Sequence, residues 1–163
     1  MLNNAQQVEQ LLDTNGKGAK AQVGYDLTLK EVKRILGGVV TTNKTQVEPY
    51  TEEEVSIIVI ENNHIPVYNL MPGSYSLTFE QGIKLPSNKT AFIRHRSSIL
   101  RCGAIITSGV YDPGFEVDEM GAVMIVTQPL AIEVGARVAQ VIIFDNSEAE
   151  LYDGQWMRNK DVK

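Results

Sequence analysis

The chain has 163 residues and a formal net charge of −5 at pH 7. This length suits one domain whose core buries roughly 70% of the surface of the unfolded chain. The negative charge argues against binding of duplex nucleic acid, and no apolar run reaches the ~20 residues that would cross a bilayer. The single cysteine excludes an internal disulfide, and the polar N-terminus lacks a signal-peptide pattern, so we expect a cytoplasmic protein.

Residues 1–22 combine one short helical pattern with turn-forming residues. Residues 5–13 predict a helix because their apolar side chains recur on one helical face, and the glycine-rich stretch 15–18 ends it. Gly37-Gly38 is expected to break the irregular stretch after the first strand. The polar, acidic residues 41–54 predict a surface loop or hairpin tip.

Most of the remaining chain reads as a β protein. Short runs rich in β-branched residues alternate with turn sequences that contain Gly, Pro or Asn. Many short strands with almost no helix favour a sandwich, a jelly roll or a distorted barrel. We therefore predict one all-β domain over residues 1–163, ending in a tail over 145–163. The expected strands are 24–29, 55–61, 65–70, 75–79, 90–95, 104–107, 122–127 and 137–144.

The most informative stretch runs from Arg96 to Asp112. Its first part contains two arginines and two serines, Arg96, Ser97, Ser98 and Arg101. The forked guanidinium donors of arginine and the short hydroxyl donors of serine together suit phosphate oxygens. Asp112 at the other end is a candidate base for a water that attacks phosphorus. Asp-Pro-Gly is also a common turn sequence, so Asp112 has a structural alternative. A phosphate grip with a base is the minimum for hydrolysing a phosphoanhydride.

Short segments between residues 24 and 156 match, in order and spacing, the motifs of one family. They are Gly24-Tyr25-Asp26-Leu27, Pro72-Gly73-Ser74-Tyr75, Leu85-Pro86, Arg96-Ser97-Ser98-Ile99-Leu100-Arg101-Cys102-Gly103, Gly109-Val110-Tyr111-Asp112-Pro113-Gly114-Phe115, Ala136-Arg137-Val138-Ala139-Gln140 and Tyr152-Asp153-Gly154-Gln155-Trp156. On these motifs the chain resembles the dUTPase and dCTP deaminase superfamily. It looks closest to the deaminase-like branch that includes archaeal and viral dUTPases. The resemblance implies a dUTPase-like distorted jelly roll or β-barrel (β-clip), assembled as a homotrimer with active sites between subunits.

The resemblance also implies an activity and roles for matching residues. The substrate would be dUTP, hydrolysed to dUMP and pyrophosphate with Mg²⁺ bound mainly through phosphates and water, in the cytoplasm (the host's, if a virus encodes the chain). Asp112 would assist the attacking water, and Asp26 would lie near the metal-water network. Triphosphate contacts would come from Arg96, Ser97, Ser98, Arg101 and Gln140, sugar and base contacts from Ile106, Thr107, Gly109, Tyr111 and Phe115, and closure from Tyr152, Gly154 and Trp156.

A dCTP deaminase is the first alternative within the same superfamily. Deamination needs a group that moves protons onto the ring and the leaving ammonia. In the deaminases this is a glutamate on the strand that corresponds to residues 122–127, where the aligned position here is Val126. That strand has no titratable side chain, which favours the hydrolase.

A non-catalytic trimer of the same fold, used as a structural or regulatory module, is the second alternative. The family usually has a glycine after the position of Phe115, whereas this chain has the acidic residues 116–120 with one apparent insertion before Gly121. Three carboxylates would repel a triphosphate if they faced the site. They would be harmless on a solvated hairpin tip.

Overall fold

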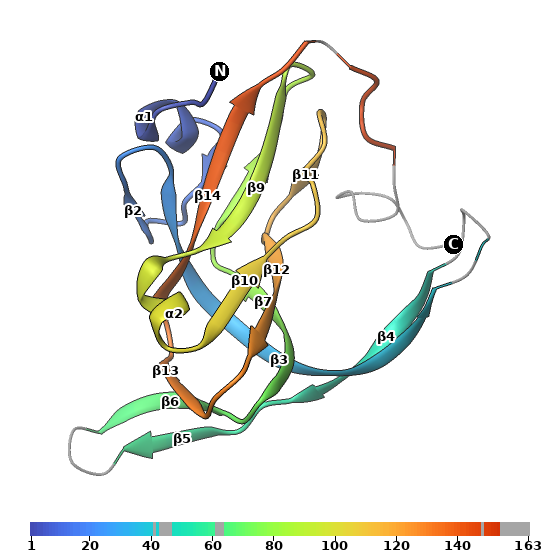
Figure 1. Cartoon of the computed structure of the whole chain (residues 1–163). Coiled ribbons are helices and arrows are strands. Elements are labelled where there is room, and N and C mark those ends of the chain that lie inside the picture. Colours follow the sequence, from blue (N-terminus) through green and yellow to red (C-terminus); the bar gives the residue numbers. More distant parts are fainter. Residues whose placement is uncertain (41, 43–46, 61–63, 148, 154–163) are drawn as a thin grey trace.

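Antiparallel strands make up most of the chain in the computed structural model (Figure 1), which describes residues 1–40, 42, 47–60, 64–147 and 149–153. This confirms the all-β class predicted from the sequence. No helix in the described ranges is long and apolar enough to cross a membrane.

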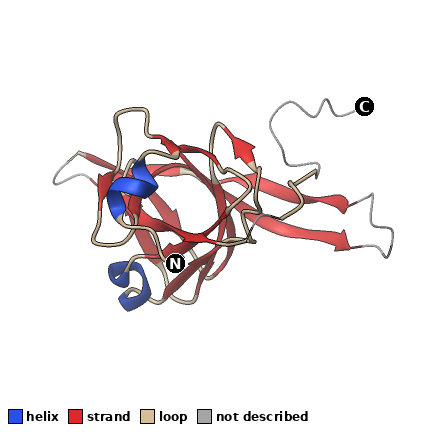
Figure 2. Ribbon diagram, turned by 90° about the horizontal axis from the view of Figure 1, so that it is seen from above, coloured by secondary structure: helices blue, strands red, loops and turns tan. Residues whose placement is uncertain are grey.

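Six strands close into a barrel, which appears as a ring when viewed from above (Figure 2). They follow the order β14-β9-β10-β12-β7-β3, and β3 pairs back onto β14. Closure leaves no free edge inside this ring, and alternate side chains fill its interior, for example Ala122, Met124 and Val126 of β12. The barrel strands are β3 (Tyr25–Val40), β7 (Gly73–Phe79), β9 (Lys89–His95), β10 (Ala104–Thr107), β12 (Gly121–Val126) and β14 (Arg137–Asp145).

Two small sheets flank the barrel, and a short strand extends it. One sheet has the order β1-β8-β11, the other has the order β13-β6-β5, and β2 pairs with β3. The first of these sheets places Glu116 and Val117, from the acidic segment 116–120, beside β8. The strands are β1 (Leu12–Asp13), β2 (Ala19–Lys20), β5 (Ile57–Ile60), β6 (Ile65–Leu70), β8 (Gly82–Lys84), β11 (Glu116–Val117) and β13 (Leu130–Glu133).

The second half of β3 leaves the barrel and forms a two-stranded arm with β4 (Val47–Glu54) (Figure 1). The predicted break at Gly37-Gly38 is therefore wrong. The surface loop or hairpin tip predicted over residues 41–54 is wrong for residues 47–54, which form β4, and residues 41 and 43–46 lie outside the described ranges. The register of the pair shifts on both sides of Gly37, whose φ of +137° suits an irregular strand position that only glycine adopts easily. Opposite charges face each other across the arm, for example Lys33 and Glu54. Such cross-strand pairs stabilise a strand whose polar composition alone predicted a loop.

Within the described residues, helix is confined to two five-residue segments. The N-terminal helix predicted over residues 5–13 is present but shorter: α1 spans Ala5–Glu9, and strand β1 begins at Leu12. Asn4 and Gln7 form a capping box that starts α1. The second helix, α2 (Ser97–Arg101), was not predicted, because five residues show too little of the helical period and its N-cap, Arg96, makes no side-chain cap.

Candidate active site

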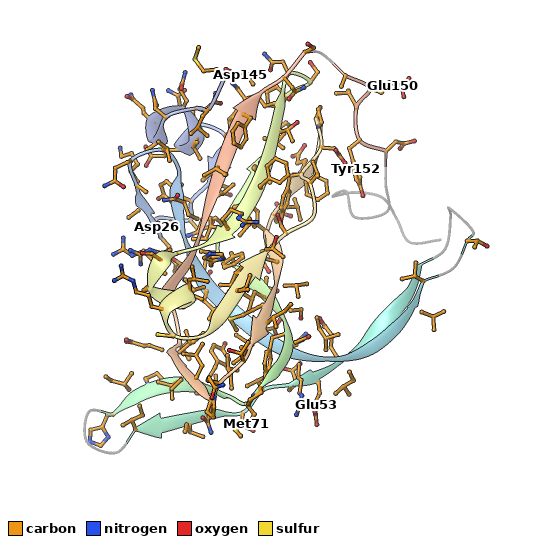
Figure 3. The ribbon with its side chains drawn as sticks, in the orientation of Figure 1. Asp26, Glu53, Met71, Asp145, Glu150 and Tyr152 are labelled. Carbon is orange, nitrogen blue, oxygen red and sulfur yellow. The ribbon has the colours of Figure 1, made fainter. Side chains whose placement is uncertain are left out.

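Asp26 lies at the centre of a polar cluster on one side of the barrel (Figure 3). Its side chain is 9% exposed, and its Oδ2 lies 3.2 Å from Nε of Arg96 and 3.8 Å from Nη1 of Arg137. Gln140 Nε2 is 3.5 Å from Oδ1, and Arg96 Nη1 donates to the carbonyl of Arg137 at 3.0 Å. One carboxylate thus holds two half-exposed guanidinium groups, which leaves net positive charge for an anion.

A β-bulge brings Arg137 and Gln140 to the same side of β14. In a regular strand, residues three apart point to opposite faces. Here the register against β3 shifts between Arg137 and Ala139, and both Val138 and Ala139 face the core. The extra residue lets Arg137 and Gln140 both reach Asp26. Sequence reasoning assigned no role to Arg137, since alternation along the strand gives no sign of the bulge.

The other predicted phosphate-binding residues lie on helix α2, which begins directly after Arg96 of this cluster. Arg96 is the N-cap of α2, so Ser97 and Ser98 follow it directly in the first turn, and Arg101 ends the helix. The side chain of Ile99 is buried and anchors α2, whereas both serines and Arg101 are exposed. The structure therefore brings the predicted phosphate contacts Arg96, Ser97, Ser98, Arg101 and Gln140 to one region beside Asp26.

A cavity of about 990 Å³ lies between the barrel and the arm. This volume falls at the upper end of the range of small-molecule sites. Its barrel side includes the loop after β10, and it contains most of the residues predicted to contact the sugar and base. The predicted residues that line it are Thr107, Gly109, Tyr111, Phe115 and Tyr152.

Three aromatic rings form one wall of this cavity. The ring centroids of Tyr111 and Phe115 are 5.1 Å apart, as are those of Phe115 and Tyr152, both in edge-to-face contact. The Tyr111 hydroxyl donates to the carbonyl of Gly121 at 2.6 Å and accepts from its N–H at 3.0 Å. Burial raises the pKa of Tyr111 to about 12, so this hydroxyl stays neutral and ties the wall to β12.

Asp112 begins the turn between Tyr111 and Phe115. The Phe115 N–H donates to the carbonyl of Asp112 at 3.1 Å, and Gly114 adopts a φ of +80°. Leu85 holds the turn from outside, because it accepts from the N–H of Gly114 and donates to the carbonyl of Phe115. The half-buried Asp112 thus lies in a hydrogen-bonded turn next to the cavity, although it is not among the lining residues.

The two halves of the predicted site lie apart in a single chain. Figure 3 shows Asp26 and Tyr152 on opposite sides of the barrel, and the residues of the Asp26 cluster do not line the cavity. Ile106 is fully buried, so only its backbone is available, and its carbonyl lies 3.3 Å from Nδ1 of His95. Gly154 and Trp156 lie outside the described residues.

The acidic segment 116–120 is held by lysines. Glu116 lies opposite Lys84 in the β11–β8 pair, and their charged atoms are 3.0 Å apart. Lys30 donates to Glu119, which together with Val117 lines the cavity. The expected repulsion of a triphosphate is therefore offset at two of the carboxylates. Because Glu119 lines the cavity, the segment does not point away from it, and the non-catalytic module stays an alternative.

No three His, Cys, Asp or Glu side chains in the described part of the chain lie close enough to hold a metal ion. Both oxygens of Asp26, the carboxylate predicted near the metal, already contact Arg96, Arg137 and Gln140. Mg²⁺ keeps several waters and often binds through substrate phosphates with one or two carboxylates. The donor set fits a metal that arrives with the nucleotide.

Comparison with known proteins identifies the family. Residues 2–146 match the family model described as dCTP deaminase-like. The chain belongs to the dCTP deaminase-like family. This confirms the resemblance predicted from the sequence motifs.

Relatives in archaea cover most of the chain. The deoxyuridine 5′-triphosphate nucleotidohydrolase of Methanocaldococcus jannaschii is 33% identical over 137 residues, which are 82% of this chain and 83% of that protein. A probable enzyme of the same name from Methanosarcina acetivorans is 28% identical over 167 residues, covering 100% of this chain and 90% of that protein.

A solved structure supports the fold. The crystal structure of a 2′-deoxycytidine 5′-triphosphate deaminase from Agrobacterium tumefaciens matches 87% of this chain with a TM-score of 0.57 and 14% identity. This chain spans about half of that one, since the match covers 47% of it. At this identity the likeness shows the fold and nothing of the activity.

Proposed function

We propose that the chain hydrolyses dUTP to dUMP and pyrophosphate. The observation that carries the proposal is the cavity lined by Thr107, Gly109, Tyr111 and Phe115, which lies directly beside the hydrogen-bonded turn of Asp112. Its size and aromatic wall suit a nucleoside. The names of the archaeal relatives point to the same substrate.

In the proposed reaction, Asp112 accepts a proton from a water molecule. The water oxygen bonds to the α-phosphorus, and the bond from that phosphorus to the oxygen bridging to the β-phosphate breaks. The products are dUMP and pyrophosphate. Arg96 and Arg101 hold the phosphate oxygens, with the hydroxyls of Ser97 and Ser98 as further donors. Mg²⁺ bound to the phosphates and water would neutralise negative charge on the leaving group.

We infer that each site is shared between copies of the chain in a homotrimer. The phosphate-binding residues beside Asp26 and the cavity beside Asp112 lie apart in one chain, so neither half is sufficient for the reaction. A neighbouring copy would supply the arginines to the cavity. We also propose a cytoplasmic location, which the exposed free thiol of Cys102 supports because such a thiol persists best in a reducing compartment.

Deamination of dCTP is the less favoured activity. The side chain of Val126, at the position aligned with the glutamate of the deaminases, is 2% exposed and faces the barrel core. Strand β12 reads Gly-Ala-Val-Met-Ile-Val and offers no group for proton transfer to a base.

Product analysis tests the proposal. The pure protein with Mg²⁺ should convert dUTP, and not dCTP, dTTP or UTP, to the monophosphate and pyrophosphate. Asp112→Asn should abolish turnover and retain dUTP binding, because it removes the base at almost unchanged shape. Release of ammonia from dCTP would restore the deaminase, and equal kcat in the variant would refute the role of Asp112. No turnover of any nucleotide would favour a non-catalytic module.

A further inference from the structure

We propose that Lys30 is a positioning residue that neutralises Glu119 at the edge of the cavity and thereby admits a polyanionic nucleotide. This inference rests on the proposed function and deepens it. The Glu119 carboxylate belongs to the acidic segment that sets this chain apart from the usual family pattern, and Lys30 was not singled out by the sequence.

Acidic side chains outnumber basic ones in the cavity lining. The residues in its lining that are charged at neutral pH are Glu31, Lys33, Glu52 and Glu119. Glu31 pairs with Lys33 at 3.4 Å, and Glu52 accepts a hydrogen bond from the uncharged Ser76. A nucleoside triphosphate carries several negative charges, so an uncompensated carboxylate at this edge would oppose its entry.

Lys30 reaches Glu119 because of a β-bulge. Leu29 lies opposite Phe79 and Glu31 opposite Thr78, so Lys30 is the one extra residue of β3 at this point. Bulges redirect a side chain out of the regular alternation. The Tyr68 hydroxyl donates to the Lys30 carbonyl at 3.0 Å and so stabilises the bulged backbone.

Glu119 is held in place from the other side. Its neighbour Met120 is fully buried, donates its N–H to the carbonyl of Gln81 at 2.8 Å, and accepts from the N–H of Phe79 at 2.9 Å. The carboxylate next to this anchor accepts a hydrogen bond from Nζ of Lys30. The same contact raises the pKa of Lys30, so the lysine is charged at all physiological pH values.

The chain supplies a matched control on the same segment. Lys84 pairs with Glu116 at 3.0 Å, and neither residue lines the cavity. Loss of Lys84 therefore removes the lysine from a carboxylate of the same segment that does not line the cavity.

The experiment measures KM and kcat for dUTP, and Kd for dUTP by calorimetry, at low and high salt in five proteins. These are the wild type, Lys30→Gln, Glu119→Gln, the double variant and Lys84→Gln. Lys30→Gln should raise KM and Kd about three- to tenfold at low salt, with a smaller effect near 0.5 M salt and kcat nearly unchanged. Glu119→Gln alone should not raise KM, the double variant should regain the wild-type value, and Lys84→Gln should match the wild type.

Two results would overturn the inference. An unchanged Kd in Lys30→Gln at low salt would show that Glu119 does not oppose binding. Failure of Glu119→Gln to rescue Lys30→Gln would mean that Lys30 contacts the nucleotide or maintains the fold, and thermal unfolding of each variant separates these two. If the wild type binds dUTP without turnover, the pattern of Kd values still decides this inference, whereas the hydrolase proposal fails on its own.

Discussion

Tyr111 joins the predicted catalytic turn to the barrel through its hydroxyl. Its side chain is 7% exposed, and it exchanges two hydrogen bonds with Gly121 at the start of β12. Its ring packs against Phe115, which in turn packs against Tyr152. Asp112 is the next residue along the chain, so the hydrogen bonds and ring contact of Tyr111 fix its position. This makes Tyr111 a structural residue in addition to its predicted contact with the nucleotide.

Tyr111→Phe tests this structural role. The variant removes both hydrogen bonds to Gly121, an exposed residue whose polar groups can then bond to water, so we expect a loss of about 0.5–1.5 kcal/mol in the free energy of unfolding at pH 7. Burial raises the folded pKa from 10.0 to about 12, so the folded wild type keeps a proton that the unfolded chain loses. Wild-type stability should fall between pH 10 and 12, and the variant should lack this part of the fall. Urea unfolding across this range measures both effects, and identical pH dependence would contradict the assignment.

At the residue scale, the sequence predicted the polar cluster only in part. Asp26, Arg96 and Gln140 were singled out through family motifs, and the structure brings them together. Arg137 and Lys30 were missed for one physical reason. Each owes its direction to a β-bulge, and a bulge is a single extra residue that hydrophobic alternation does not reveal.

At the scale of elements, the turn that carries Asp112 depends on Gly114. Its φ of +80° lies in the left-handed region, and an added Cβ would come within 3.0 Å of the Leu151 side chain. Gly114→Ala should therefore lower the free energy of unfolding by about 1–2 kcal/mol. Gly109→Ala is the control for stability, because among the described residues no atom lies within 4 Å of its added Cβ, and its effect should stay within about 0.5 kcal/mol. Equal unfolding midpoints for the two variants would argue against strain at Gly114.

The prediction of secondary structure succeeded where apolar and polar residues alternate along the chain. It failed where a segment becomes a strand only through the strand it pairs with. The strands expected over residues 65–70, 75–79 and 104–107 are confirmed, because β-branched residues at period two mark a half-buried strand. Strand β4 was taken for a loop, since Glu53 and Glu54 lie opposite the basic residues Arg34 and Lys33 only in the paired arm. Helix α2 is too short to show a period.

At the scale of the whole molecule, barrel closure explains how the site is divided. The pairing of β14 with both β9 and β3 places Gln140 between Arg94 and Asp26, so the arginines gather where the ring closes. The cavity lies instead between the arm and strands β7, β10 and β12. The sequence motifs predicted both groups of residues, but only the closed ring shows that they lie apart. Ring closure joins strands that are distant in sequence, and periodicity carries no such information.

If sites are shared between copies, two variants that each lack one group of the site should restore each other's activity. Asp112→Asn removes the base, and Arg101→Ala removes an exposed phosphate contact that we expect to contribute about 1.5–3 kcal/mol to dUTP binding. In assemblies co-expressed from both variants, random pairing leaves about a quarter of the interfaces with both native groups, because each heterologous interface takes one group from either copy. Below the KM for dUTP, the mixture should therefore regain about that share of wild-type turnover. Asp112→Asn alone should stay near background, and Arg101→Ala alone should keep less than about a tenth of wild-type turnover. A double variant co-expressed with either single variant is the control, since none of its interfaces combines both native groups. No recovery in assemblies of confirmed mixed composition would place the whole site within one chain.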